Sequence, residues 1–242
     1  MTTGSFHVEF GQAAIGDDAD VLCQILTPQF NLAVWDKAGE RLSRSAYMQS
    51  LNPKSLGRSL PWKENYFKTL FSLPISRQPV KRQDMIRELN RHLVTAGFPA
   101  RALFQKSQPD DLFTRNDLAS ALYDFSRHFA QAIDKNSKIT LLVFRPDGNK
   151  FWHNDGGSVR GIITLRGNEG TLWRPDSSLV GETCTKGIYW GDVDPEKQDF
   201  IQTISPGSMA IFKCRDHVNP LVHATPASKE CRLVAIMSPE RR

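Results

Sequence analysis

The sequence predicts an α+β fold in which a mostly helical N-terminal part precedes a set of short strands. Two observations lead to this prediction. Apolar residues recur at helical spacing in the first part, and beyond Asn136 the period shifts to about two, in short β-branched or aromatic runs separated by Gly, Pro, Asn and Asp. We therefore expect residues 1–136 to form a mostly helical supporting extension and residues 137–242 to form a β-rich core.

Three helices are expected before residue 137. Apolar spacing in "NYFKTLFSL" and in "RQDMIRELNRHLVTAGF" predicts helices between Asn65 and about Ala96, and Gly97 stands where the second would end. The segment "TRNDLASALYDFSRHFAQAIDKN" predicts a third helix with Asn116 as its N-cap. Its apolar face, which we expect to pack against the strands, contains Leu118, Leu122, Phe125, Phe129 and Ile133.

Seven short runs after Asn136 are typical of strands, and so many strands after a helical part indicate a sandwich or barrel supported by helices. The runs are "KITLLVFRP", "VRGIITLRG", "GTLWRP", "DFIQTISPG", "SMAIFKC", "LVHATP" and "CRLVAIMSP".

Composition restricts the classes of partner and location. Lys and Arg number 31 against 26 Asp and Glu, a net charge of +5 that favours anions. The basic residues are scattered without a polybasic block, so they give only weak support to a nucleic-acid partner. The N-terminus is a poor signal peptide, and no apolar run approaches the ~20 residues that span a bilayer. We expect a soluble, cytoplasmic protein with no membrane association, whose four widely spaced cysteines are buried reduced thiols.

The stretch "FRPDGNKFWHNDGG" contains a His-x-Asp pair, His153 and Asp155. Residues i and i+2 of a strand point to the same face, so the imidazole and the carboxylate can bind one metal ion together. The alternative is a polar pair at a strand end that satisfies local backbone groups. Downstream partners distinguish the two interpretations.

Iron(II) enzymes that activate oxygen commonly bind the metal through two histidines and one carboxylate. His223, flanked by apolar residues in "PLVHATP", is the expected second histidine, and His217 in the polar segment "CRDHVNP" is the competing candidate. Arg232 begins the alternation Arg232, Val234, Ile236 in "RLVAIMS". A guanidinium that faces the interior of an apolar barrel needs an anion as its partner.

In these features the sequence resembles the iron(II)/2-oxoglutarate-dependent dioxygenase superfamily, within an uncharacterised bacterial family that has the same core. The resemblance covers roughly residues 138 to 240 and rests on "VFRPDGNKFWHND", "VRGIITLRGNEGTLWRP", "SPGSMAIF", "VHATP" and Arg232, in that order. It implies a double-stranded β-helix, or jelly-roll, core with Fe(II) held by His153, Asp155 and His223. It further implies 2-oxoglutarate as cosubstrate, with Arg232 on its distal carboxylate, and O2 as oxidant.

Three positions depart from patterns found in the superfamily. Ser238 stands where the nucleic-acid demethylase branch has a second arginine, Val234 stands where many relatives have a serine, and Phe144 replaces a common tyrosine. These departures make that branch a poorer match and affect the cosubstrate pocket more than the metal site. Three further arginines are alternative anchors for the acid or contacts for the substrate: Arg160, Arg166 and Arg174.

The sequence thus predicts an iron(II)- and 2-oxoglutarate-dependent oxygenase, a hydroxylase or demethylase of unidentified substrate. The alternative from another class is a non-catalytic, cupin-like metal sensor or metal-handling protein, for which the same three metal ligands would serve. Arg232 separates the two, because metal binding alone does not require it.

Overall fold

The fold is known from a computed structural model, which describes the residue ranges that follow. They are 5–63, 67–78, 81–102, 113–146, 152–174, 180–185, 188–192, 201–226 and 228–240, with only the backbone described for 180–185 and 188–192.

The described strands form two sheets, one of eight strands in the order β1-β2-β3-β12-β7-β14-β5-β4 and one of six in the order β11-β8-β13-β6-β10-β9. The strands of the larger sheet are β1 (Phe6–Glu9), β2 (Ala13–Gly16), β3 (Leu32–Trp35), β4 (Phe67–Ile75), β5 (Ser137–Phe144), β7 (Val159–Arg166), β12 (Met209–Lys213) and β14 (Arg232–Pro239). Those of the smaller sheet are β6 (Trp152–Asn154), β8 (Thr171–Arg174), β9 (Val180–Thr185), β10 (Ile188–Asp192), β11 (Gln202–Ile204) and β13 (Val222–Ala224).

Eight of these strands form a jelly roll, which confirms the predicted fold class. Strands β5, β7, β12 and β14 lie together in the larger sheet, and β6, β8, β11 and β13 lie together in the smaller one. Strands that follow one another in the chain mostly cross from one sheet to the other, so the two sheets enclose a common interior. Each of the seven runs predicted as strands from Lys138 onward contains a strand, and Asp199 and Phe200 of "DFIQTISPG" lie outside the described residues.

The N-terminal part contributes four strands to the larger sheet, which the sequence analysis did not predict. Strand β3 pairs with β12 at one side of the jelly roll, and β4 pairs with β5 at the other. The helix predicted over "NYFKTLFSL" was wrong, because Phe67–Ile75 is β4. Its Phe, Thr, Leu and Ile side chains suit a strand as well as a helix, and pairing with the long strand β5 decides between them.

The two long helices α3 (Arg82–Thr95) and α4 (Arg115–Ala132) confirm the other two helix predictions. Gly97, with φ +88, follows the end of α3 as expected. The N-cap of α4 is Thr114 rather than Asn116, because Thr114 and Asp117 form a reciprocal capping box. The short helices are η1 (Ala19–Leu26), α1 (Glu40–Ser43), α2 (Ala46–Ser50) and η2 (Pro53–Ser55). None of the helices in the described ranges has the length and apolar character needed to cross a membrane.

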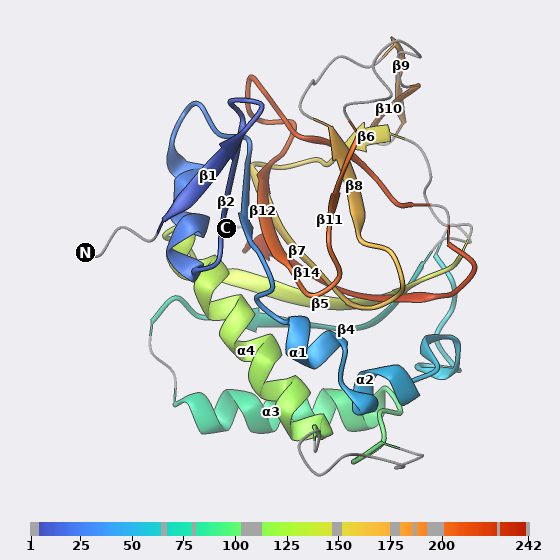
Figure 1. The fold of residues 1–242 in the computed structure, drawn as a ribbon. Helices are drawn as coiled ribbons and strands as arrows, with labels where there is room; N and C mark the ends of the chain where they lie inside the picture. Colours follow the sequence, from blue (N-terminus) through green and yellow to red (C-terminus); the bar gives the residue numbers. More distant parts are fainter. Residues whose placement is uncertain are drawn as a thin grey trace.

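Helices α3 and α4 cover the face of the larger sheet that points away from the smaller sheet (Figure 1). The predicted apolar face of α4 is buried there, and Phe129 lies so close to β7 that a Cβ at Gly161 would be 2.7 Å from its ring. A second apolar cluster, which includes Trp173 and Phe212, fills the space between the sheets. Among the cysteines whose side chains are described, Cys23 and Cys214 form no disulfide, and Cys214 is buried as predicted whereas Cys23 is exposed.

Candidate metal centre

Two neighbouring strands of the smaller sheet bring the predicted metal ligands together. His153 lies in β6, and Asp155 follows the last residue of that strand. His223 lies in β13 and is the direct cross-strand partner of His153. Residues directly opposite each other in an antiparallel pair point to the same face, and so do residues i and i+2. Strand pairing therefore directs the two histidines to one point, and the position of Asp155 two residues after His153 brings the carboxylate to the same face.

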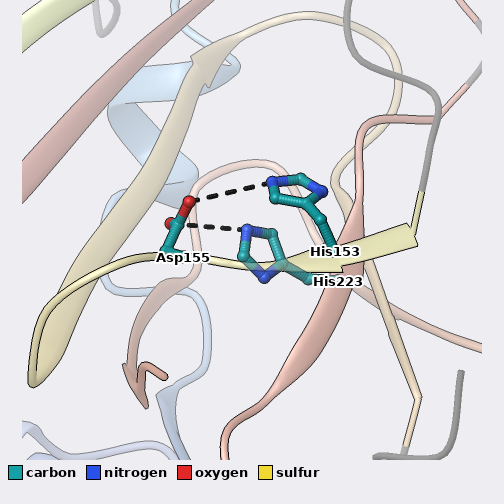
Figure 2. Close-up of side chains that lie close together, drawn as sticks. All are labelled: His153, Asp155 and His223. Carbon is teal, nitrogen blue, oxygen red and sulfur yellow. Dashed lines mark ion pairs between the residues drawn. The ribbon is translucent and has the colours of Figure 1, made fainter. Parts of the chain in front are cut away.

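The three side chains form a compact, buried cluster. One ligand atom from each lies within 4.8 Å of the others, and no residue of the three is more than 9% exposed. His153 Nε2 is 3.8 Å from Asp155 Oδ1, and His223 Nε2 is 3.5 Å from Asp155 Oδ2. Figure 2 shows the two imidazoles pointing toward the two oxygens of the one carboxylate.

The electrostatics of the cluster favour the protonation states that bind metal. Burial, followed by the neighbouring His153, lowers the pKa of His223 to about 3, so its imidazole is neutral at neutral pH. Burial alone would raise the pKa of Asp155, but Arg160 and the two imidazoles outweigh it and hold this pKa below its usual value. Metal binding requires an unprotonated imidazole and a carboxylate. Two nitrogens and one oxygen fit a divalent transition metal, so the donor set is suitable for Fe(II).

Arg160 is the charged neighbour of this cluster. Its Nη1 lies 3.0 Å from Asp155 Oδ2, and its Nε is buried without a hydrogen-bond partner in the part of the chain that is described. Alternation along β7 places Arg160 on the same face as Thr164, toward the interior of the jelly roll. The sequence suggests Arg160 as an anchor for the acid or a contact for the substrate. The structure places it against the proposed metal-ligand carboxylate.

Arg232 lies inside the jelly roll, at the start of β14. It is 2% exposed, and its Nη2 donates to Thr164 Oγ1 at 2.9 Å and to Thr171 Oγ1 at 3.4 Å. Its Nε has no hydrogen-bond partner, and within the described ranges no acid forms an ion pair with it. Burial lowers its pKa to about 10, with partial opposition from Glu169, so it remains charged at neutral pH. Burial of a cation that is satisfied only by hydroxyl groups is costly, so Arg232 is suited to pair with an anion.

The side chains next to Arg232 differ in whether they can form hydrogen bonds with it. Phe144 is its cross-strand partner on β5, and Val234 packs in the interior cluster. Neither side chain offers a hydrogen bond. Thr164 and Thr171 provide the hydroxyl groups, and neither is among the site residues predicted from the sequence. Alternation along β7 was the signal that could have found Thr164, because it stands two residues beyond the buried Ile162.

The remaining candidates lie elsewhere. His217 is exposed in the loop after β12 and does not belong to the cluster that the described residues form. Arg166 lies 3.7 Å from Glu230 at the far end of β7. Arg174 is fully buried on β8, 5.9 Å from the ring of Trp152, and its guanidinium has no hydrogen-bond partner among the side chains and backbone groups that the structure describes.

Comparison with known proteins gives one family match and several structural likenesses. No curated protein matches the chain. A dioxygenase for auxin oxidation from Arabidopsis thaliana, solved with 2-oxoglutarate, is 10% identical with a TM-score of 0.45, covering 94% of this chain and 91% of its own. A Pseudomonas putida prolyl-4-hydroxylase is 12% identical with a TM-score of 0.42, covering 93% and 98%. Neurospora crassa T7H is 12% identical with a TM-score of 0.40, covering 100% of both chains.

The family match spans most of the sequence, including strands β3 and β4 and the strands of the jelly roll. A family model described as "Protein of unknown function (DUF1826)" matches residues 16–237. The matched range contains the triad and Arg232. The chain belongs to the DUF1826 family.

Proposed function

We propose that the protein is an iron(II)- and 2-oxoglutarate-dependent oxygenase that hydroxylates or demethylates a substrate not yet identified. The observation on which this rests is Arg232, a charged guanidinium inside the same jelly roll as the His153, Asp155 and His223 cluster. A metal-binding role alone explains the cluster and leaves this buried cation without an anion. A dicarboxylate that reaches from the metal to Arg232 accounts for both features.

The three ligand residues would occupy one face of the metal, leaving the opposite positions for the cosubstrate and for oxygen. Bound iron(II) would supply the oxidising chemistry, in which 2-oxoglutarate and O2 are converted to succinate and CO2 as the substrate is oxidised. The protein's residues hold and orient these groups. Burial of the triad keeps bulk water away from it, which strengthens the electrostatic interactions made there.

Arg232 would bind the distal carboxylate of 2-oxoglutarate. Thr164 and Thr171 hold its Nη2, so the guanidinium is oriented before the ligand arrives. Its Nε has no hydrogen-bond partner among the described residues and can therefore donate to a carboxylate oxygen of the ligand. The absence of hydroxyl groups at Phe144 and Val234 leaves the two threonines as polar support for this contact.

An anaerobic titration tests the proposal without knowledge of the substrate. Iron(II) and then 2-oxoglutarate are added to metal-free protein, and the visible charge-transfer absorption of a keto acid chelated to iron is recorded. We expect the band in the wild-type protein, its loss in His153→Ala, and a much higher 2-oxoglutarate requirement in Arg232→Gln with iron affinity preserved. Lys138→Gln, an exposed lysine of β5, is the matched control.

The opposite outcome favours the second candidate. If metal binds stoichiometrically but 2-oxoglutarate gives no band and does not raise the melting temperature of the metal-bound protein, the cosubstrate assignment fails. A non-catalytic, cupin-like metal-binding protein is then the better description. Arg232 would in that case bind another anion.

A further inference from the structure

We propose that a pocket at the end of the jelly roll away from the metal ligands, here called the anion pocket, binds a small organic anion with two or more negative charges. The pocket has a volume of about 550 Å³. This lies within the range of roughly 300–1,000 Å³ typical of small-molecule sites. The inference is independent of the proposed oxygenase function.

The pocket's position separates it from the metal site. Arg160, which contacts Asp155, stands near the start of β7, whereas Arg166, which lines the pocket, is the last residue of that strand. At a rise of about 3.3 Å per residue, the α-carbons of these two arginines are about 20 Å apart. Neither Asp155 nor either histidine of the triad lines the pocket.

The pocket's charge indicates an anionic ligand. Four cationic side chains line it, Lys54, Arg145, Arg166 and Lys229, against one acid, Glu230. Arg166 lies 3.7 Å from Glu230, near the limit of an ion pair, and no described residue forms a hydrogen bond with its buried Nε. The other three cations form no ion pair with an acid anywhere in the described ranges. One carboxylate cannot neutralise four cations, so a ligand with at least two charges suits the site.

Trp62 holds cationic side chains of the pocket region in place through cation–π contacts. The guanidinium carbon of Arg145 lies 4.6 Å from the centre of the Trp62 ring, and Lys68 Nζ lies 5.1 Å from it. Lys68 is buried and donates to the carbonyl oxygens of Lys54 and Gly57, which fixes the loop that carries Lys54. A guanidinium held against an indole keeps its N–H groups available for bidentate binding of a carboxylate or phosphate.

Apolar side chains indicate that the ligand has a carbon skeleton. Leu51, Pro53 and Pro146 line the pocket beside the cations. Such surface contributes little to the binding of an inorganic ion, whereas it adds contact area for an organic one. Carboxylate and phosphate groups share the chemistry that four cations recognise, and the experiment has one arm for each.

Isothermal titration calorimetry of the metal-free, full-length protein tests the site with two probes. Citrate represents polycarboxylates, and 3-phosphoglycerate represents phosphate esters. We expect one molecule of at least one probe to bind per chain, and the dissociation constant to rise about tenfold or more in Arg145→Gln and in Lys229→Gln. Arg145→Lys, which keeps the charge but loses the planar fork, is expected to recover only part of the affinity.

Two controls keep the proposal falsifiable. Lys229 is exposed, so its substitution tests the site even if loss of the Arg145 and Trp62 contact unfolds the protein. Lys138→Gln, an exposed lysine outside the pocket, is expected to bind both probes like the wild type. The proposal is overturned if neither probe binds, if Lys138→Gln weakens binding as much as Lys229→Gln, or if Arg232→Gln abolishes binding that both pocket variants retain.

Discussion

Arg160 Nη1 lies 3.0 Å from Oδ2 of Asp155, the carboxylate that also faces both histidines of the triad. The carboxylate therefore has a cationic partner even when no metal is bound. The Arg160 side chain is 27% exposed and that of Asp155 is 12% exposed, so the pair lies at the edge of the buried site.

Removal of this partner makes the fold more dependent on the metal. We expect Arg160→Gln to destabilise the metal-free protein by about 1–3 kcal/mol, less than the ~3–5 kcal/mol for a fully buried pair, because Arg160 is partly exposed. A bound divalent ion can take over as the cation beside Asp155, so metal should raise the melting temperature more in Arg160→Gln than in the wild type.

Thermal unfolding with and without metal measures this difference. Arg82→Gln is the matched control, because Arg82 pairs with Asp124 on the exposed surface of α3 and α4. It should cost less than about 1 kcal/mol and leave the metal response unchanged. Equal metal responses in Arg160→Gln and the wild type would show that Arg160 does not substitute for the ion.

The two candidate distal histidines give opposite predictions. His223 is buried and faces Asp155, whereas His217 is exposed in a loop. We expect His223→Ala to weaken iron(II) binding by more than the roughly 10–100-fold that loss of an outer partner costs, because it removes a ligand atom itself. His217→Ala should bind metal like the wild type. Equilibrium dialysis with metal analysis decides between them, and a loss of metal in His217→Ala would exclude the assignment of His223.

Gly167 controls the space beside Arg232. Its φ is +146, and a Cβ at this position would lie 2.9 Å from Arg232 Cγ. We expect Gly167→Ala to displace the arginine and to weaken 2-oxoglutarate binding while iron(II) binding is preserved. Gly97→Ala is the matched control, because Gly97 also has a positive φ, +88, but has open space around it. Both variants should lose about 1–3 kcal/mol from backbone strain.

Calorimetric titration of 2-oxoglutarate into the metal-bound variants separates strain from displacement. Only Gly167→Ala should show the weaker binding. If Gly97→Ala shows it to the same degree, general destabilisation is the cause and the contact with Arg232 is irrelevant.

His128 links stability to pH at a distance from the metal ligands. Burial lowers its pKa from the usual value of 6.5, and the carboxylates of Asp124, Asp18 and Asp20 offset only part of that effect. As the pH drops below about 6.5, His128 is protonated more readily in the unfolded chain than in the folded one. The free energy of unfolding should therefore fall over this range.

Denaturant unfolding at a series of pH values measures this contribution. His128→Gln should give a shallower loss of stability than the wild type between about pH 6.5 and 5. An unchanged slope in His128→Gln would assign the loss to other groups.

The sequence predicts the centre of the site better than its surroundings. The order of His153, Asp155, His223 and Arg232 along predicted strands was enough to expect a common interior, because strand alternation fixes the direction of each side chain. Arg160 lay on a predicted strand too. Its contact with Asp155 depends on the turn between β6 and β7, whose path no periodicity specifies.

Long-range pairing limits what the sequence reveals about the fold. The run around Phe71 is compatible with a helix or a strand until β5 is placed beside it. The anion pocket combines Trp62, Arg145 and Glu230, which come from distant parts of the chain. No local sequence pattern predicts such a site, because none of these residues belongs to a motif and they meet only in the folded chain.

The pairing of β3 with β12 has a consequence for how the chain reaches its native state. Strand β3 pairs with the nearby β2 on one edge, but on the other edge Leu32 pairs with Phe212, so a strand made early in synthesis gains its second partner only much later. Contacts between such distant segments slow folding, because a large loop must close before the contact contributes. We expect the nascent chain to carry an unpaired β3 edge until β12 emerges from the ribosome, an interval in which protection by chaperones would matter most.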